Sequence, residues 1–485
     1  MGSDALNFDV AARSRCEKSV TGNTLATSRS NKSESGIKEK NMAKRMADQT
    51  TLSRRGFITS SAGGLAGLTA AGVLASANAG RAAGGEPIPI GAAVPLTGWA
   101  AADGIEYKRG LELAAEEVNA MGGILGRPIE FHFEDTQVMG PENVVPAIQR
   151  LIDREKVHAI INGYNGSTAT AEYDLIADDG LIYIHANTDV QHHHALERDP
   201  ERYATIFMSD PAEVWYGEGL LSFLKGLTES GQFEPKNRTM ALILGSDSYG
   251  AVIGSGISDN AAKYGWIIGL TETVSYGISE WGPIISKLRN DPPGVIAFTH
   301  WAPQDLAQFM LQFTPNPTDS LVYMQYGPSL SAFRDIAQTS SEGVIFSSVA
   351  QSLQDEIGLA FMERYRAKFG SEGTSPLNGA IPYDSVFMYA AAAAMAGGTG
   401  EPGEMEQNRK VAAILKQSIY RGVKGITRFS DKWQAAIPYP DATRDPSLGM
   451  PHQYSQIQDW KKDAQVIAPS PYETASYLAP SWMSK

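Results

Sequence analysis

Short apolar runs alternate with helical patterns from residue 86 onward. Residues 87–94 form an apolar run, which predicts a strand. In residues 104–121 the apolar side chains recur at i, i+3, i+4 and i+7, namely at Leu111, Ala114, Ala115 and Val118. This spacing predicts an amphipathic helix, which the following Gly122-Gly123 ends. The change of period indicates an α/β chain.

The same alternation continues to about residue 325. Further strands are predicted at residues 129–133, 157–161, 181–184, 239–244, 267–273, 294–299 and 320–324. Helices are predicted around residues 144–154, from Thr168, and near Tyr249, Trp281 and Gln304. Strands that alternate with helices form parallel sheets with right-handed crossovers. Because 485 residues are too many for one ordinary domain, the two series predict two lobes.

The charge balance excludes one class of partner. The first 79 residues contain 11 Lys and Arg and 6 Asp and Glu, which leaves 30 basic and 48 acidic residues, a net charge of −18, in the rest. Such an acidic chain is not expected to bind nucleic acid. Cys16, the only cysteine, lies in this leader, so thiol and disulfide chemistry are not expected beyond it.

The leader, residues 1–79, carries an export signal. Ser53-Arg54-Arg55-Gly56-Phe57-Ile58 has the pattern of a twin-arginine motif, and a Gly/Ala-rich apolar run and the small-x-small site Ala77-Asn78-Ala79 follow it. We expect cleavage after Ala79 and export to the periplasm by the twin-arginine pathway. The alternative is an arginine pair before a buried helix.

Residues 159–173 have the pattern of a binding loop. Gly163 and Gly166 let the backbone turn tightly and approach a ligand, and Ser167 and Thr168 stand where the N-cap of a helix belongs. Free N–H groups in the first turn of a helix bind carboxylate or amide oxygens without a basic side chain. An ordinary strand-to-helix turn is the alternative interpretation.

The loops after the predicted strands are rich in aromatic residues. In open parallel sheets ligands bind at the carboxyl ends of the strands. The loops at these ends contain the five aromatic residues Trp99, Tyr164, Tyr249, Trp301 and Tyr326. If these rings converge, they form a closed slot for a small organic ligand.

Several motifs resemble one family. Pro-Leu-Thr-Gly at residues 95–98, Asn-Ala-Met-Gly-Gly-Ile-Leu-Gly-Arg-Pro-Ile at 119–129, Phe-Glu-Asp-Thr at 133–136, the Gly-Ser-Thr loop and Ser-Asp-Ser-Tyr-Gly at 246–250 are similar to the periplasmic leucine/isoleucine/valine and amide binding proteins of ABC importers. The resemblance covers about residues 87–430. It implies the type I periplasmic binding fold, in which two Rossmann-like lobes with mostly parallel sheets are joined by a three-segment hinge.

The resemblance also implies a domain organisation and partners. Lobe 1 would comprise residues 87–210 and 347–427, and lobe 2 residues 211–346 and 428–470, with a C-terminal tail at 471–485. The hinge crossings would lie near Glu213, Phe346 and Phe429. We expect a monomer without cofactor or metal, which takes a small-molecule ligand and delivers it to ABC permease subunits.

The family's site maps onto named positions. The resemblance implies that Gly166, Ser167, Asn187 and Asp189 hold a ligand carboxylate. It further implies that Tyr249 closes from lobe 2 and that Trp99 and Trp301 line the side-chain pocket.

Two departures change the expected ligand. Tyr326 stands where amino-acid binders place an acid for the ammonium group, and Asp189 or, shifting by one, Thr188 stands where they place a small hydroxyl residue. Glu213 could replace the missing acid. We therefore expect leucine to bind less tightly than an aromatic or amide-bearing solute. The Pro- and Tyr-rich extension after Phe429 is longer than the family needs, and no function is assigned to it.

Catalytic signatures are absent from the sequence. It contains no H-E-x-x-H, no phosphate-binding G-x-x-x-x-G-K-[ST] and no G-x-S-x-G. His192, His193 and His194 are expected in a solvated turn, with a metal or ligand contact as the alternative. An exported enzyme and a ligand sensor with the same two lobes remain as alternatives to a solute receptor.

Overall fold

The computed structural model describes residues 84–165 and 170–483. All of them belong to Gly67–Lys485, one of the two units into which the chain divides. The predicted twin-arginine motif, its cleavage site and residues 166–169 lie outside the described residues. Among the described residues, none of the helices combines the length and the apolar character needed to cross a membrane.

Five parallel strands form the first sheet. Their order is β2-β1-β3-β4-β5, with β1 (Ile88–Val94), β2 (Ile129–Asp135), β3 (Ala159–Ile161), β4 (Ile182–His185) and β5 (Ile206–Met208). Alternate residues of β1 enter two separate core clusters, Ile90 in one and Ala93 in the other. Both faces of the sheet are therefore covered, as a continuous apolar strand requires.

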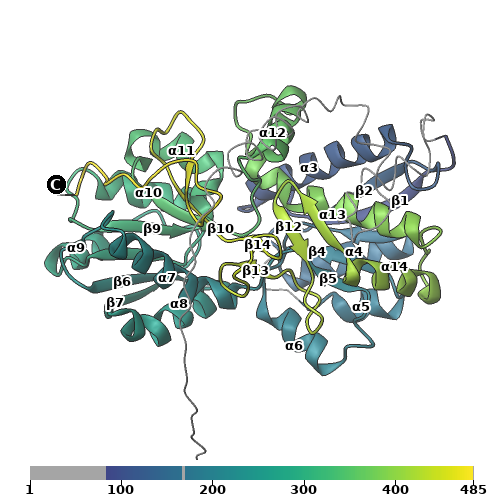
Figure 1. Ribbon diagram of the computed structural model, residues 1–485, viewed down its shortest axis with the longest axis horizontal. Helices are drawn as coiled ribbons and strands as arrows, with labels where there is room; N and C mark the ends of the chain where they lie inside the picture. The colour runs from purple at the N-terminus through teal and green to yellow at the C-terminus, as the bar shows by residue number, and fades with distance from the viewer. Residues whose placement is uncertain (1–83, 166–169, 484–485) are drawn as a thin grey trace, which may run out of the picture. The chain divides into compact units, whose positions relative to one another are not determined.

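Helices cover the two faces of this sheet (Figure 1). On one face lie α3 (Ala101–Ala120) and α13 (Pro376–Met395), and on the other α4 (Pro141–Asp153), α5 (Tyr173–Asp178) and α6 (Val190–Arg198). The backbones of α3 and α13 approach closely, since a Cβ at Gly110 would lie 1.9 Å from the Gly379 carbonyl oxygen. The nearby helices α12 (Glu356–Phe369) and α14 (Met405–Gln417) complete lobe 1.

A seven-stranded sheet forms the centre of lobe 2. Its order is β16-β15-β10-β9-β8-β6-β7, with β6 (Thr239–Gly245), β7 (Ile267–Val274), β8 (Val295–Phe298), β9 (Leu321–Gln325), β10 (Ile345–Ser348), β15 (Gln453–Gln456) and β16 (Gln465–Ala468). In this sheet β15 pairs antiparallel with both β10 and β16, and the other neighbouring strands pair in parallel. The helices on its faces are α7 (Tyr216–Glu229), α8 (Ser248–Asn260), α9 (Gly282–Asn290), α10 (Pro303–Phe313) and α11 (Ser331–Ala337).

The chain passes between the two sheets three times. It leaves lobe 1 after β5 through the 3-10 helix η2 (Glu213–Trp215), and it leaves lobe 2 after β10. It leaves lobe 1 again after the hairpin of β11 (Ile419–Gly422) and β12 (Gly425–Arg428), before β15. Between β12 and β15 lies a short parallel pair, β13 (Pro438–Tyr439) and β14 (Met450–Pro451).

Two local predictions were wrong. The helix expected from Thr168 is α5, which begins at Tyr173 with Glu172 at its N-cap. His192, His193 and His194 do not lie in a solvated turn but on α6, whose N-cap is Asp189. His192 and His193 are buried because α6 packs against the first sheet and against Trp433.

Candidate functional site

A cavity of about 60 Å³ lies where the carboxyl ends of the two sheets meet. This is space for several water molecules, so the cavity suits a small ligand. Residues of both lobes line it: Tyr164, Ala186, Asn187, Thr188, Asp189, Asp210, Tyr216, Asp247, Tyr249, Trp301, Gln325, Tyr326, Ser348, Val349, Ala350 and Ile381.

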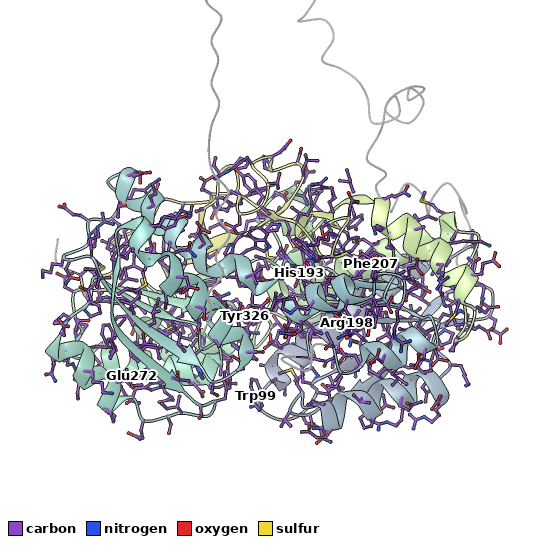
Figure 2. The ribbon with its side chains drawn as sticks, turned by 90° about the horizontal axis from the view of Figure 1, so that it is seen from below. Trp99, His193, Arg198, Phe207, Glu272 and Tyr326 are labelled. Atoms are coloured by element: carbon purple, nitrogen blue, oxygen red, sulfur yellow. The ribbon has the colours of Figure 1, made fainter. Side chains whose placement is uncertain are left out.

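Aromatic rings from both lobes form one wall. The ring centroid of Tyr164 lies 5.6 Å from that of Trp301 and 6.1 Å from that of Tyr326, in both cases edge to face. Trp99 lies outside these rings, 5.0 Å from Trp301 and stacked at 5.2 Å on Tyr276. It is 39% exposed and does not line the cavity, and Figure 2 shows it at the rim, away from Tyr326.

A buried carboxylate fixes two of these rings. Asp103, on α3, accepts hydrogen bonds from the Tyr164 hydroxyl at 2.5 Å and the Tyr326 hydroxyl at 2.6 Å. Asn378 of α13 donates to the Tyr326 oxygen at 2.7 Å. Burial raises the pKa of Asp103 to about 6. Tyr326 comes from lobe 2, so these bonds tie the two lobes together on one side of the cavity.

The backbone adapts to place these rings. A Cβ at Gly163 would lie 2.2 Å from the ring of Tyr107, so only glycine lets the loop before Tyr164 pass over that ring. Tyr326 has φ +57° and ψ −56°, a region that non-glycine residues rarely adopt. The hydrogen bond that the Tyr326 hydroxyl donates to Asp103, and the one it accepts from Asn378, hold the residue there.

Carboxylates also line the cavity. Asp189 is the N-cap of α6 and accepts from the Gln191 amide at 2.8 Å. Asp247 is the N-cap of α8 and accepts from Trp301 Nε1 at 3.0 Å. The caps explain the positions of both acids, and burial raises the pKa of Asp189.

Glu213 has no such structural partner. It is 1% exposed, and neither carboxylate oxygen has a hydrogen-bond partner of good geometry. Burial, reinforced by the charges of Asp189 and Asp247, raises its pKa to about 8. Its own amide donates to the Thr188 carbonyl at 2.7 Å, which places it directly behind the cavity wall. A buried acid without a partner is costly unless a cation or a donor approaches it.

Positive charge does not reach the cavity wall. None of the described lining residues is Lys, Arg or His. Lys424 lies behind Asp210 and pairs with it at 2.8 Å, with both side chains 1% exposed. The cavity therefore presents acids and rings to a ligand, and no free cation.

The structure brings most predicted site residues together. Tyr164, Asn187, Asp189, Tyr249, Trp301 and Tyr326 line the cavity, Glu213 lies behind Thr188, and Trp99 stacks at the rim. Gly166 and Ser167 lie outside the described residues. Sequence reasoning missed Asp103, Asp247 and Gln325. Only Asp247 had a local signal, because it precedes a helix in the Ser-Asp-Ser-Tyr-Gly motif.

His192 of α6 and His185 of β4 belong to a buried hydrogen-bond network next to Asn187. His192 Nδ1 lies 2.7 Å from the Tyr173 hydroxyl, which also contacts His185 Nε2 at 2.7 Å. His185 Nδ1 accepts from the Asn187 amide at 3.2 Å. Burial lowers the pKa of His192 to about 3, so it acts as a neutral hydrogen-bonding group. Among the described residues, no group of three or more His, Cys, Asp or Glu could hold a metal ion.

Comparison with known proteins shows a family. A family model described as periplasmic binding protein matches residues 87–439. The Leu/Ile/Val-binding protein homolog 8 of Brucella abortus (strain 2308) is 25% identical over 296 residues, which are 59% of this chain and 72% of that protein. The leucine-, isoleucine-, valine-, threonine-, and alanine-binding protein of Pseudomonas aeruginosa is 22% identical over 350 residues, 72% of this chain and 87% of that protein.

Solved structures share the fold. A chain from Silicibacter pomeroyi, provisionally described as a branched-chain amino acid ABC transporter, is 48% identical with a TM-score of 0.77, over 82% of this chain and all of that one. A solute binding protein from R. palustris in complex with benzoate has a TM-score of 0.63 at 14% identity, over 82% of this chain and 99% of that one. These likenesses confirm the predicted fold of two α/β lobes.

Proposed function

The chain belongs to the family of periplasmic binding proteins, and from this we propose that it captures a small nitrogen-containing solute between its lobes and delivers it to an ABC permease. The family match confirms the predicted solute receptor in the periplasm. The class of solute follows from the cavity and is our own proposal.

One observation carries the choice of solute. Glu213 is buried near Asp189 and Asp247 with no basic side chain and no hydrogen bond of good geometry at its carboxylate, and none of the described residues that line the cavity is basic. A solute with an ammonium or amidinium group, or with amide N–H donors, would relieve the repulsion among these acids. The rings of Tyr164 and Trp301 would add cation–π and stacking contacts. An amino acid or an amide fits better than a solute that carries only a carboxylate.

Further parts of the proposal rest on the sequence. We propose export by the twin-arginine pathway, on the motif at residues 53–58, and action as a monomer without catalytic activity, cofactor or nucleic acid. We also keep the predicted lobe boundaries and the hinge at the three connections, near Glu213, Phe346 and Phe429. Relatives named as amino-acid-binding and transporter proteins support a role in transport.

A thermal-shift screen tests the class of solute. The panel contains amino acids, amides, ureas, aromatic amines and the nitrogen-free acid benzoate, assayed against wild type, Glu213→Gln and the exposed control Glu234→Gln. We expect nitrogen-bearing solutes to raise the melting temperature of wild type and of the control, because they bind only the folded state. In Glu213→Gln we expect the rise in melting temperature to shrink most for the cationic solutes. Benzoate as the strongest ligand would contradict the proposal.

Small-angle scattering tests the closing mechanism. The ligand found in the screen should reduce the radius of gyration at saturation, because it contacts both lobes and so selects the closed state. An unchanged radius at saturation would refute closure while leaving the binding result intact.

A further inference from the structure

The segment between β12 and β15 reaches the ligand site from behind. The Met450 amide donates to the Ile437 carbonyl at 2.8 Å and the His452 amide to the Tyr439 carbonyl at 2.7 Å. With the β13–β14 pairing, these bonds close the segment into a loop. The loop places the side chains of Asp441 and His452 next to each other, although eleven positions separate them.

The two side chains form the first part of a buried chain of hydrogen bonds. Asp441 Oδ2 lies 2.7 Å from His452 Nδ1, and His452 Nε2 lies 3.1 Å from Ser347 Oγ on β10. The imidazole is fully buried and fits because α7 has glycine at position 219, where a Cβ would lie 3.0 Å from the ring. The Tyr216 ring packs against the imidazole at 5.1 Å.

The chain of hydrogen bonds continues to Gln325, a residue that lines the cavity. Ser347 on β10 is the register partner of Gln325 on β9, and its Oγ donates to Gln325 Oε1 at 3.2 Å. The Tyr323 hydroxyl, 2.6 Å from Ser347 Oγ, also donates to Gln325 Oε1. Two hydroxyl groups therefore hold the carbonyl end of this amide away from the cavity.

The orientation of Gln325 decides what Tyr249 can do. Gln325 Nε2 donates to the Tyr249 hydroxyl oxygen at 2.9 Å. Since the amide already supplies a proton to this oxygen, the phenolic proton is free to point elsewhere, and Tyr249 lines the cavity. We propose that Asp441, His452 and Ser347 are positioning residues that fix the Gln325 amide, so that Tyr249 donates its proton to an acceptor oxygen of the ligand. This rests on the proposed function, because it takes the cavity as the ligand site.

The same three residues have the order of a hydrolase triad, which is a different possibility. Ser347 is fully buried, does not line the cavity, and is held by Tyr323 and Gln325. A nucleophile must reach a carbonyl carbon, and here Gln325 separates Ser347 from the cavity. Treatment with a fluorophosphonate probe should therefore leave Ser347 unlabelled, and labelling would overturn the positioning role.

A pair of matched probes tests the role in binding. L-Phenylalaninamide and phenethylamine share a ring and an ammonium group, but only the first has a carbonyl oxygen. Calorimetry on wild type should show about a 10-fold preference for the amide, the value of one good hydrogen bond. In Ser347→Ala this preference should fall below about 3-fold, because the variant binds L-phenylalaninamide less tightly while its affinity for phenethylamine is unchanged. Asp441→Asn should change it in the same direction.

A buried serine elsewhere provides the control. Ser385 on α13 is buried and its Oγ has no hydrogen-bond partner, so Ser385→Ala should leave both affinities unchanged. An equal loss of affinity for both probes in Ser347→Ala would show that Ser347 has only a structural role, and it would overturn the proposal. The absence of any preference in wild type would overturn it as well.

A measurement without ligand separates this proposal from the proposed function. If neither probe binds wild type, the proposed class of solute fails. The chain of hydrogen bonds from Asp441 to Gln325, called the relay here, is then tested by NMR of ¹⁵N-histidine-labelled protein. The His452 Nε2 resonance should shift in Ser347→Ala and stay in place in Ser385→Ala. An unchanged resonance in Ser347→Ala would show that the relay does not exist.

Discussion

The buried pair of Lys424 and Asp210 should dominate the stability of the lobe junction. Lys424 Nζ lies 2.8 Å from Asp210 Oδ1, and both side chains are 1% exposed. The backbone amides of Val423 and Lys424 donate to Asp384 at 2.9 and 3.0 Å, which fixes the turn that carries the lysine. Lys424→Met keeps an unbranched side chain, removes the ammonium group and leaves Asp210 buried without its partner.

Removal of one partner from a buried ion pair costs about 3–5 kcal/mol, because the remaining charge is uncompensated. We therefore expect the free energy of unfolding of Lys424→Met to fall by this amount at pH 8. The double variant Lys424→Met/Asp210→Asn should lose less than the sum of the single variants, since it buries no unpaired charge. Urea denaturation followed by circular dichroism measures all three variants.

The pH dependence gives a second check. Burial raises the pKa of Asp210, and removal of the ammonium raises it further. When a carboxyl has a higher pKa in the folded protein than in the unfolded protein, the free energy of unfolding falls as pH rises between the two values. The loss of stability in Lys424→Met should therefore be smaller at pH 5 than at pH 8. The exposed pair of Lys432 and Glu197 is the control, and Lys432→Met should cost less than about 1 kcal/mol. Additive single variants, or equal penalties at both pH values, would refute the reasoning.

Three further predictions concern the site itself. The pKa of Glu213, about 8, exceeds its unfolded value of 4.5, so stability falls as pH rises between them, and Glu213→Gln should reduce the difference in melting temperature between pH 5 and pH 8. Tyr326→Phe should cost about 1–3 kcal/mol in urea denaturation, because buried Asp103 loses a hydrogen-bond donor; an unchanged midpoint would contradict the inter-lobe bond. Leucine should bind less tightly than L-phenylalaninamide in calorimetry, and submicromolar leucine binding that survives Trp301→Ala would refute this order.

The sequence by itself determined the elements and their order. The change from strand to helix period predicts β1 and α3 because backbone geometry repeats locally, every two residues in a strand and every 3.6 in a helix. It also placed Trp301 and Tyr326 near one another, since the parallel strands β8 and β9 end at the same edge of one sheet. These predictions depend only on neighbours within one element or on one sheet.

The tertiary structure alone decided which polar groups meet. Asp103 on α3 bonds to Tyr326, 223 positions away, and no local pattern marks that pairing. The expected solvated turn at His192 was wrong because Trp433, from the last crossing of the chain, covers that helix. His452 contacts Ser347, 105 positions away, and this pairing too has no local pattern in the sequence. The three passages of the chain between the sheets bring distant segments together, and burial there sets the charges and hydrogen bonds of the site.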